Sequence, residues 1–304
     1  MIESRYLIHF IEIAERKSYS RAAKQLHLSQ PALTRSIQKL EALLGVKLFH
    51  RGGKRILLTV FGETLLPRAR RIVCSLNDTK QAISALKGLQ TGELRVGFGP
   101  VYTDLIASSA ISQFIKTYPG IKIRSSMGPW SEMIKALDDS IIDLFIGEIS
   151  TITGKKAYCC QPLKKRPAVY FCRAGHPAFQ KDKVDVSVFS RYPLVAPQLP
   201  ERLSFLVHSV DEQPRKGTTT FHYSDIVCDS FQMMKQIVKE SNAIGVIPKA
   251  LITNELMQGT ICAIPVQHKK LTSLGGIVYI ADREPSPATM KFIKIVKNLD
   301  KELH

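Results

Sequence analysis

Residues 18–51 read SYSRAAKQLHLSQPALTRSIQKLEALLGVKLFHR, and this stretch decides how the N-terminal part of the chain folds. The first half predicts a short helix with Ala22 and Ala23 on one apolar face, and we expect Ser20 to cap its N-terminus. A sharp turn follows. Ser29 is then placed to cap a second helix, so the stretch predicts two helices joined by a tight connection.

The second helix has an apolar side and a polar side. Apolar residues recur at steps of four, three and four, namely Leu33, Ile37, Leu40 and Leu44. Pro31 falls in the first turn, where its missing N–H costs no hydrogen bond, and Gly45 provides a C-terminal stop. The polar side carries Gln30, Thr34, Arg35 and Gln38. This layout is typical of a helix-turn-helix, whose second helix presents its N-terminal side chains to the major groove of DNA.

A basic hairpin is predicted directly after the second helix. Short apolar segments at 47–49 and 56–58 flank the sequence His50-Arg51-Gly52-Gly53-Lys54-Arg55. Two glycines between β-capable segments favour a hairpin, and its cationic tip is suited to DNA phosphates. We interpret it as the wing of a winged helix-turn-helix. The alternatives are a plain solvated hairpin and a small helical bundle whose polar residues are merely solvated.

A long helix is expected next, capped by Thr59 and extending to about Leu86 or Lys87. Its apolar positions alternate steps of four and three, as in a heptad repeat: Leu65, Ala69, Ile72, Leu76, Thr79, Ile83 and Leu86. One isolated helix of this length is marginal in water, so it needs packing along its length. Packing against its own domain is one solution, and the narrow stripe favours the other, a coiled coil with a second copy.

These residues resemble, almost position by position, the N-terminal domain of LysR-type transcriptional regulators. The matching residues are Phe10, Ala14, Ser18, Ser20, Ala22, Ala23, Leu26, Ser29, Gln30, Pro31, Ala32, Leu33, Arg35, Ile37, Leu40, Glu41, Leu44, Gly45, Leu48, Phe49, Arg51, Leu58, Thr59 and Gly62. The resemblance implies a DNA-binding domain over 1–59 and a linker helix over 60–89 that pairs two subunits. A symmetric dimer would then read two half-sites of a palindrome.

Nine residues are the candidates for DNA contact: Ser29, Gln30, Pro31, Thr34, Arg35, Lys39, Arg51, Lys54 and Arg55. Arg is suited to read guanine, Gln to bond adenine, and Thr34 to touch a thymine methyl group. Lys39 and the three hairpin residues are expected on phosphates or in a neighbouring minor groove.

The charge of the chain agrees with a nucleic-acid partner. The net charge is +17, and residues 1–90 hold 16 Lys and Arg against 6 Asp and Glu. A basic excess alone would also suit a membrane surface or an acidic protein, but beside the helix-turn-helix it favours DNA phosphates. We find no signal-peptide core, no membrane-spanning stretch and no metal-type cysteine spacing. The expected location is the cytoplasm, with reduced thiols and no membrane contact.

Gly88-Leu89-Gln90-Thr91-Gly92 marks a domain boundary, because beyond it strands alternate with helices. Strands are expected at 94–98, 121–125, 144–146, 169–172, 194–196, 245–248 and 277–281, and helices at 104–117, 131–139, 201–210, 230–241 and 287–299. Such alternation predicts a mainly parallel sheet with helices on both faces. The family resemblance implies an effector-binding domain over 92–304, built of two α/β subdomains like those of periplasmic binding proteins. Subdomain I would be 92–163 with 269–304, and subdomain II 164–268, with crossings near 161–164 and 266–270.

Known catalytic motifs are missing from the sequence. Gly97-Phe98-Gly99 follows a strand, but Tyr102 replaces the third glycine of the dinucleotide fingerprint. We therefore expect no enzyme activity, no cofactor and no metal. Ligands of open α/β sheets bind beyond the carboxyl ends of strands. The candidates for contact with a small-molecule effector on that basis are Phe98, Gly99, Tyr102, Thr103, Trp130, Gln198, Ser230 and Phe231.

The resulting hypothesis is a sequence-specific transcriptional regulator controlled by a small molecule bound between the two C-terminal subdomains. Its expected partners are a double-stranded promoter palindrome, an effector of unknown identity, itself as a homodimer or homotetramer, and RNA polymerase. The main alternative is a ligand-independent architectural DNA-binding protein, motivated by the +17 charge. A solute-binding protein or enzyme built on the α/β part is the second alternative.

Overall fold

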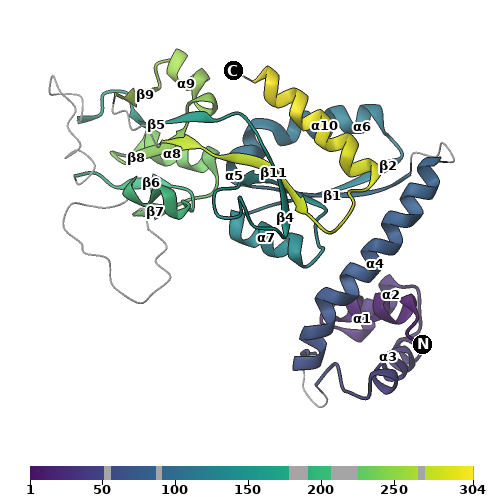
Figure 1. The fold of residues 1–304 in the computed structure, drawn as a ribbon. Coiled ribbons are helices and arrows are strands. Elements are labelled where there is room, and N and C mark those ends of the chain that lie inside the picture. The colour runs from purple at the N-terminus through teal and green to yellow at the C-terminus, as the bar shows by residue number, and fades with distance from the viewer. Residues whose placement is uncertain (51–55, 87–90, 178–190, 207–224, 266–270, 304) are drawn as a thin grey trace. The chain divides into compact units, whose positions relative to one another are not determined.

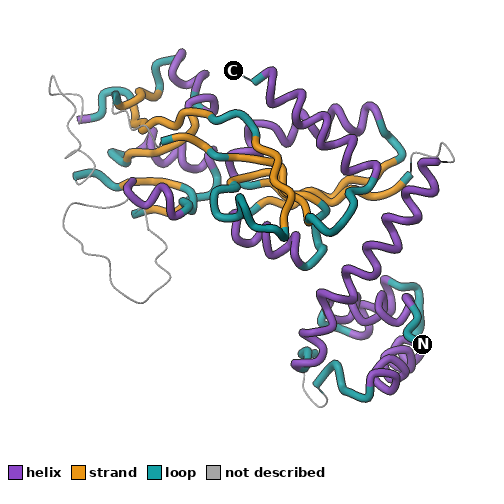
Figure 2. Tube along the Cα trace, in the orientation of Figure 1, coloured by secondary structure: helices purple, strands orange, loops and turns teal. Residues whose placement is uncertain are grey.

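The computed structural model describes residues 1–50, 56–86, 91–177, 191–206, 225–265 and 271–303 (Figure 1). The chain divides into two compact units. One comprises Met1–Thr91 with Lys135–Ile142, and the other Gly92–Ile134 with Asp143–His304. Figure 2 shows that the N-terminal part is built mainly from helices, whereas the C-terminal part mixes strands and helices. None of the described helices combines the length and apolarity needed to cross a bilayer.

The helix-turn-helix forms where the sequence predicts it, from α2 (Tyr19–Gln25) and α3 (Gln30–Leu44). A further helix that the sequence analysis did not predict, α1 (Ser4–Arg16), packs against both. Their apolar faces meet in one core that includes Phe10, Ile13, Ala22, Leu33, Ile37 and Leu40. Ser29 caps α3 by accepting a hydrogen bond from the backbone N–H of Ala32 at 3.4 Å. Gly45 ends α3 in the left-handed region, with φ 69°, which glycine adopts without strain.

The predicted cap of α2 is wrong by two residues. Ser18 has the extended backbone of a cap and accepts a hydrogen bond from the N–H of Arg21 at 3.3 Å. The helix has already begun at Tyr19, so Ser20 lies in its first turn and its side chain points elsewhere. Its hydroxyl donates to Gln30 Oε1 at 2.9 Å, which ties α2 to the start of α3.

The base of the predicted wing is a hairpin. Phe49 and Leu58 form an antiparallel bridge, and the N–H of His50 donates to the carbonyl of Leu57 at 2.9 Å. The tip residues Arg51, Lys54 and Arg55 lie outside the described residues. Helix α4 (Val60–Leu86) follows directly.

Thr59 joins the hairpin to α4. Its hydroxyl accepts a hydrogen bond from the N–H of Gly62 at 3.2 Å and donates to the carbonyl of Lys47 at 2.6 Å. A Cβ on Gly62 would lie 2.3 Å from the carbonyl oxygen of Leu48, so only glycine lets α4 pass this close to the hairpin. The predicted cap at Thr59 is therefore confirmed.

The heptad stripe of α4 divides into two parts. Leu65 and Ala69 pack into the core of the N-terminal domain. Further along, Ile72, Leu76, Ile83 and Leu86 are exposed. Contacts within the N-terminal domain therefore cover only the first part of the stripe, and the second part has no such cover among the described residues.

The C-terminal unit contains two sheets. The first has the order β2-β1-β3-β11-β4 and the second β10-β5-β8-β6-β7, with β9 paired to β5. The strands of the first sheet are β1 (Gly92–Phe98), β2 (Ile121–Met127), β3 (Leu144–Glu148), β4 (Tyr158–Pro162) and β11 (Gly275–Ile280). Those of the second are β5 (Arg166–Arg173), β6 (Leu194–Ala196), β7 (Ile226–Val227), β8 (Ile244–Pro248), β9 (Ile261–Ile264) and β10 (Thr272–Ser273).

Helical segments flank both sheets. They are α5 (Pro100–Tyr102), the π-helical turn η1 (Thr103–Ala107), α6 (Ser108–Thr117), α7 (Trp130–Asp138), the 3₁₀ segments η4 (Glu201–Leu206) and η5 (Lys249–Leu251), α8 (Phe231–Glu240), α9 (Thr253–Met257) and α10 (Pro287–Glu302). Helices α6 and α10 lie side by side along the first sheet, where Phe98, Phe114 and Phe292 fill the core (Figure 1). The second sheet packs Phe171 against Phe231, Met234 and Val238.

The expected parallel arrangement holds for most strands, but one strand in each sheet is reversed. Strand β11 runs antiparallel to β3 and β4, and β5 runs antiparallel to β8, β9 and β10. The reversed strands are the two that follow a crossing, because the chain enters the second sheet on β5 and begins its return along the first sheet on β11. The sequence expectation also left out β4, β7, β9, β10 and α9. The helix expected at 201–210 is described as far as Leu206 and is a 3₁₀ segment.

A buried ion pair holds the first crossing. Arg166 Nη2 donates to Asp300 Oδ1 at 2.6 Å, and both side chains are almost fully buried. The N–H of Lys164 donates to the other carboxylate oxygen at 2.8 Å. The crossing segment is thereby tied to the C-terminal end of α10. The return crossing lies at Leu274, because β10 still pairs with β5 in the second sheet.

Candidate functional site

The outward face of α3 presents the residues that the sequence analysis assigned to DNA. Ser29, Gln30, Pro31, Arg35 and Lys39 are exposed, and Thr34 is half-buried. The opposite face is fixed in the core, so the backbone that carries these side chains is held in place. His9 and Ser36 add a polar tie between α1 and α3, with Nδ1 and Oγ 2.6 Å apart.

The polar residues of α3 occupy different positions along the helix. The amide of Gln30 is oriented by the hydroxyl of Ser20, which donates to its oxygen. Lys39 lies further along the helix, and its Nζ sits 5.8 Å from the centre of the Tyr6 ring on α1. The arrangement thus places Gln30 and Arg35 in the N-terminal half of α3 and Lys39 further along, beside α1.

A second basic cluster was missed by the sequence analysis. Arg16, Arg21, Lys24, Gln25 and His27 line a shallow surface depression formed by α1, α2 and the following turn. Arg16 also pairs with Glu12 on its own helix. Arg21 and Lys24 could have been predicted from the sequence, because the first helix of a helix-turn-helix, here α2, typically crosses the DNA backbone.

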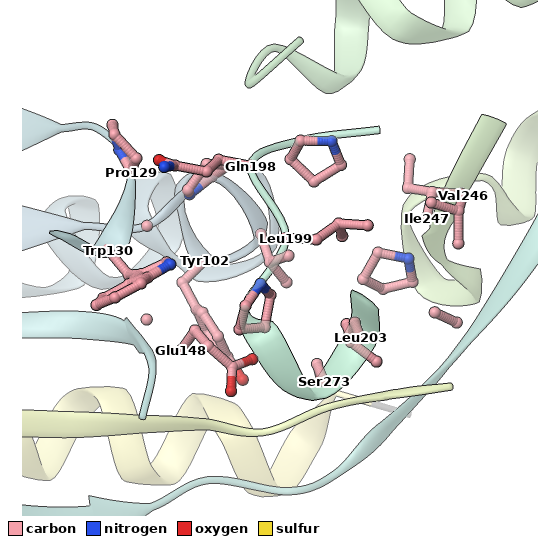
Figure 3. Close-up of a pocket in the computed structure, with 18 of the residues that line it drawn as sticks. Tyr102, Pro129, Trp130, Glu148, Gln198, Leu199, Leu203, Val246, Ile247 and Ser273 are labelled. Atoms are coloured by element: carbon pink, nitrogen blue, oxygen red, sulfur yellow. The ribbon is translucent and has the colours of Figure 1, made fainter. Parts of the chain in front are cut away.

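A pocket lies between the two sheets of the C-terminal unit, with a cavity volume of about 90 Å³ (Figure 3). Five of the eight residues expected at an effector site line it: Gly99, Tyr102, Trp130, Gln198 and Phe231. They come from both sheets. Gly99 follows β1 and Gln198 follows β6, each at the carboxyl end of its strand.

The other three expected residues do not line the pocket. Phe98 is buried in the first core, with its ring centre 6.5 Å from that of Phe292. The hydroxyl of Thr103 donates to the carbonyl of Gly99 at 3.1 Å. Ser230 caps α8 by accepting from the N–H of Met233 at 3.3 Å. Each of them supports a segment that carries a lining residue.

The pocket wall also contains an ion pair that the sequence analysis missed. Arg202 Nε donates to Glu148 Oε1 at 3.1 Å, and Arg202 Nη2 donates to Oε2 at 2.8 Å. Glu148 ends β3 in the first sheet, whereas Arg202 lies on η4, which follows β6 of the second. The contact therefore connects the two halves of the domain in a bidentate geometry, which is the strong form of such a pair.

Two buried polar groups lie in the pocket wall without a hydrogen-bond partner among the described residues. They are the indole Nε1 of Trp130 and the phenol oxygen of Tyr102. Burial raises the pKa of Tyr102 to about 12, an effect partly offset by nearby Ser273 and Arg166, so the phenol keeps its proton at neutral pH. Buried donors of this kind are normally satisfied, so they indicate a place for a ligand or ordered water.

The described residues include no group of three or more His, Cys, Asp or Glu side chains placed to hold a metal ion. Cys172 and Cys262 are cross-strand neighbours on β5 and β9, and both are free thiols. Burial raises the pKa of Cys172 to about 12, which makes it a poor nucleophile.

Comparison with known proteins assigns both parts of the chain to one family. Residues 4–63 match the family described as "Bacterial regulatory helix-turn-helix protein, lysR family", and residues 87–300 match "LysR substrate binding domain". The chain belongs to the LysR family. It is a DNA-binding transcriptional regulator with an effector-binding domain. The architectural alternative is not favoured, because the matches include the effector domain as well.

The regulator has relatives along its full length. It is 31% identical over 292 residues to the "SDS degradation transcriptional activation protein" of a Pseudomonas strain, covering 95% of this chain and 93% of that protein. Its fold resembles a full-length OxyR variant of Pseudomonas aeruginosa, with TM-score 0.70, 19% identity and coverage of 100% and 99%. It also resembles full-length CbnR, whose structure was solved with its target DNA, with TM-score 0.61, 19% identity and coverage of 98% and 100%.

Proposed function

We propose that the regulator reads its DNA site through the N-terminal half of α3, with Gln30, Pro31, Thr34 and Arg35 in the major groove and Ser29 at its edge. Lys39 would bind phosphate, together with Arg51, Lys54 and Arg55 of the wing. The observation that carries this proposal is the two-sided build of α3, whose apolar face is buried and whose polar face is exposed.

Arg35 and Lys39 are expected to contribute in different ways. An arginine fork that bonds guanine discriminates by about 1–3 kcal/mol against a wrong base. A lysine on phosphate contributes through counterion release and carries no sequence information. Both side chains are exposed on the same helix, so their removal should not unfold the domain.

A pair of variants tests this assignment. A genome-wide footprint of the purified full-length protein first supplies the binding site. Arg35→Ala is then expected to lose about 5- to 150-fold on that duplex and little on a random duplex. Lys39→Ala is expected to weaken both duplexes alike and to lower the salt dependence of binding. Equal loss on both duplexes for Arg35→Ala would contradict its role as a base reader.

We further propose that the pocket between the sheets is the effector site, with Gly99, Tyr102, Trp130, Gln198 and Phe231 in contact with the ligand. Phe98, Thr103 and Ser230 would act indirectly by holding these segments in place. The support is that the five come together from both sheets around one cavity. A ligand that binds one relative arrangement of the two sheets more tightly than another would increase the population of that arrangement. Coupling between the effector domain and the DNA-binding domain would then alter DNA binding.

We propose that the chain is organised as a DNA-binding domain over 1–59, a dimerisation helix over 60–89 and an effector-binding domain over 92–304. The exposed stripe of α4 supports a homodimer or homotetramer. Because its partner is DNA, we place the regulator in the cytoplasm, where RNA polymerase would be its partner at the promoter. We propose no catalytic role for it, since its relatives are transcriptional regulators.

A further inference from the structure

Arg202 is the one cationic side chain in the described lining of the pocket, and Glu148 the one carboxylate. The two are each about one-fifth exposed, at 20% and 17% of the side chain. Because water screens this pair only in part, both the opposite charges and the two parallel hydrogen bonds stabilise it. Any charged ligand that enters this pocket must therefore compete with one member of the pair.

The other polar groups nearby favour an anionic competitor. Figure 3 shows the ring of Tyr102 extending toward the carboxylate of Glu148. This phenol is protonated and has the hydroxyl of Ser273 beside it, whereas Trp130 Nε1 can only donate and has no acceptor among the described residues. An anionic oxygen group at the position of Glu148 would meet the Arg202 fork and the Tyr102 hydroxyl together.

Glu148 has a second donor available and can leave Arg202 without being stranded. The backbone N–H of Ser150 donates to its Oε1 at 3.2 Å. The carboxylate also belongs to the last residue of β3, in the lining of the pocket. If a ligand anion displaces Glu148 from Arg202, the anion has Arg202 and Tyr102 as hydrogen-bond donors and Glu148 keeps the N–H of Ser150. If a ligand cation displaced Arg202 instead, Tyr102 and Trp130 would gain no acceptor.

The rest of the wall is apolar and small in volume. Leu199, Leu203, Val246 and Leu271 face the cavity beside Trp130. A cavity of about 90 Å³ has room for roughly six to nine water-sized groups. A short hydrocarbon chain or small ring with one head group is of this size.

We propose that the effector is a small molecule with an apolar body and one anionic oxygen group, and that this group takes Arg202 from Glu148. The inference rests on the proposed effector site. The exchange breaks the direct bidentate contact between β3 and η4 and replaces it with a contact through the ligand, which Arg202 holds from one half of the domain and Tyr102 from the other. Arg202 is then the residue that determines specificity for anions, and Glu148 is the internal competitor of the ligand.

Trp130 provides a direct readout. It is the only tryptophan in the sequence and it lines the pocket, so its fluorescence in the full-length protein reports occupancy. The probes are hexanoate, hexyl sulfate, hexan-1-ol and hexylamine, which share one chain and differ in the head group. The two anions are expected to change the Trp130 emission with saturation, and the alcohol and amine to bind at least tenfold more weakly.

Three variants complete the experiment. Arg202→Gln is expected to weaken both anions at least tenfold, and Glu148→Gln to tighten them severalfold because the internal competitor is gone. Lys235→Gln is the matched control, since it removes a similarly exposed ion pair, with Glu255, whose residues lie outside the pocket lining. It is expected to leave the affinities unchanged. If Arg202→Gln does not fold, Arg202→Lys replaces it, with at least a threefold loss expected.

The outcomes separate this proposal from the effector site itself. If hexan-1-ol binds as well as the anions and Arg202→Gln changes neither, the exchange is refuted while the pocket remains the site. Preference for hexylamine, lost in Glu148→Gln, refutes it in favour of a cationic effector. If no probe changes the emission of any variant, the exchange and the assignment of the pocket both fail. A stronger response to hexyl sulfate or to hexanoate supports the proposal and identifies the head group.

Discussion

The exposed stripe of α4 makes a quantitative prediction about self-association. Ile83 lies in the second part of the stripe and is 51% exposed in the single chain. Full burial of an isoleucine side chain contributes about 1.5–3 kcal/mol, so burial of the exposed half by a partner contributes about 0.8–1.5 kcal/mol. In a symmetric dimer the residue counts twice, which gives about 1.5–3 kcal/mol.

Ile83→Ser is therefore expected to weaken dimerisation about 10- to 100-fold, since each 1.4 kcal/mol is a factor of ten. Isoleucine and serine have similar helix propensities, so the helix itself should persist. The matched control is Ile115→Ser on α6, where the isoleucine is 48% exposed but lies outside the stripe.

Sedimentation equilibrium of the full-length protein over a wide concentration range measures both dissociation constants. The control is expected to associate like the parent protein. If Ile83→Ser and Ile115→Ser give the same dissociation constant as the parent, the stripe is not the dimer seam, and the reasoning from exposed heptad positions is refuted.

Two further predictions concern the effector domain. Burial opposes ionisation of Asp143, but the charge and hydrogen bonds of Arg95, helped by Arg283, outweigh it and lower the pKa of Asp143. The stability contributed by this carboxylate is thus present above its unfolded pKa of about 3.9 and lost as the pH falls below it. In urea unfolding, Asp143→Asn should be less stable at pH 7, with a gap that narrows below about pH 4; a constant gap would contradict this. A Cβ on Gly275 would lie 1.6 Å from the phenol oxygen of Tyr102, so Gly275→Ala should destabilise the domain by about 1–3 kcal/mol in thermal unfolding. Tyr102→Leu in the same chain should restore part of that loss, and no recovery would point to another cause.

The helix-turn-helix could be predicted closely because its determinants are local. Ser29 and Gly45 mark the two ends of α3 by hydrogen bonds and backbone angles that involve only their near neighbours. The cap at Ser18 was missed because two serines stand two residues apart, and only the start of the helix at Tyr19 decides between them.

The pocket was predicted in part for a similar reason. Strand ends are visible in sequence, so Gly99 and Gln198 were found. Glu148 closes the buried strand Leu144–Glu148 and satisfies the same rule, so it could have been nominated. Arg202 could not, because its partner is 54 residues away along the chain. Phe98 and Ser230 lie within the right segments, but a pattern does not tell which neighbouring side chain faces the cavity.

The ion pair that holds the first crossing was the least predictable feature. Arg166 and Asp300 are 134 residues apart in the chain, and nothing local marks them as partners. The reversed strands β5 and β11 each follow a crossing, and alternation of strands and helices along the chain does not reveal which strands are reversed.

The junction at Thr59 has a consequence for how a signal reaches DNA. One hydroxyl binds both the hairpin and the first turn of α4, and Gly62 brings the two backbones into contact. A joint this tight holds the bridge between Phe49 and Leu58 in a fixed position relative to the start of α4. Leu65 and Ala69 anchor the same part of α4 in the core of the N-terminal domain. A change at the first turns of α4 is therefore passed directly to the base of the hairpin and to the core that supports α3.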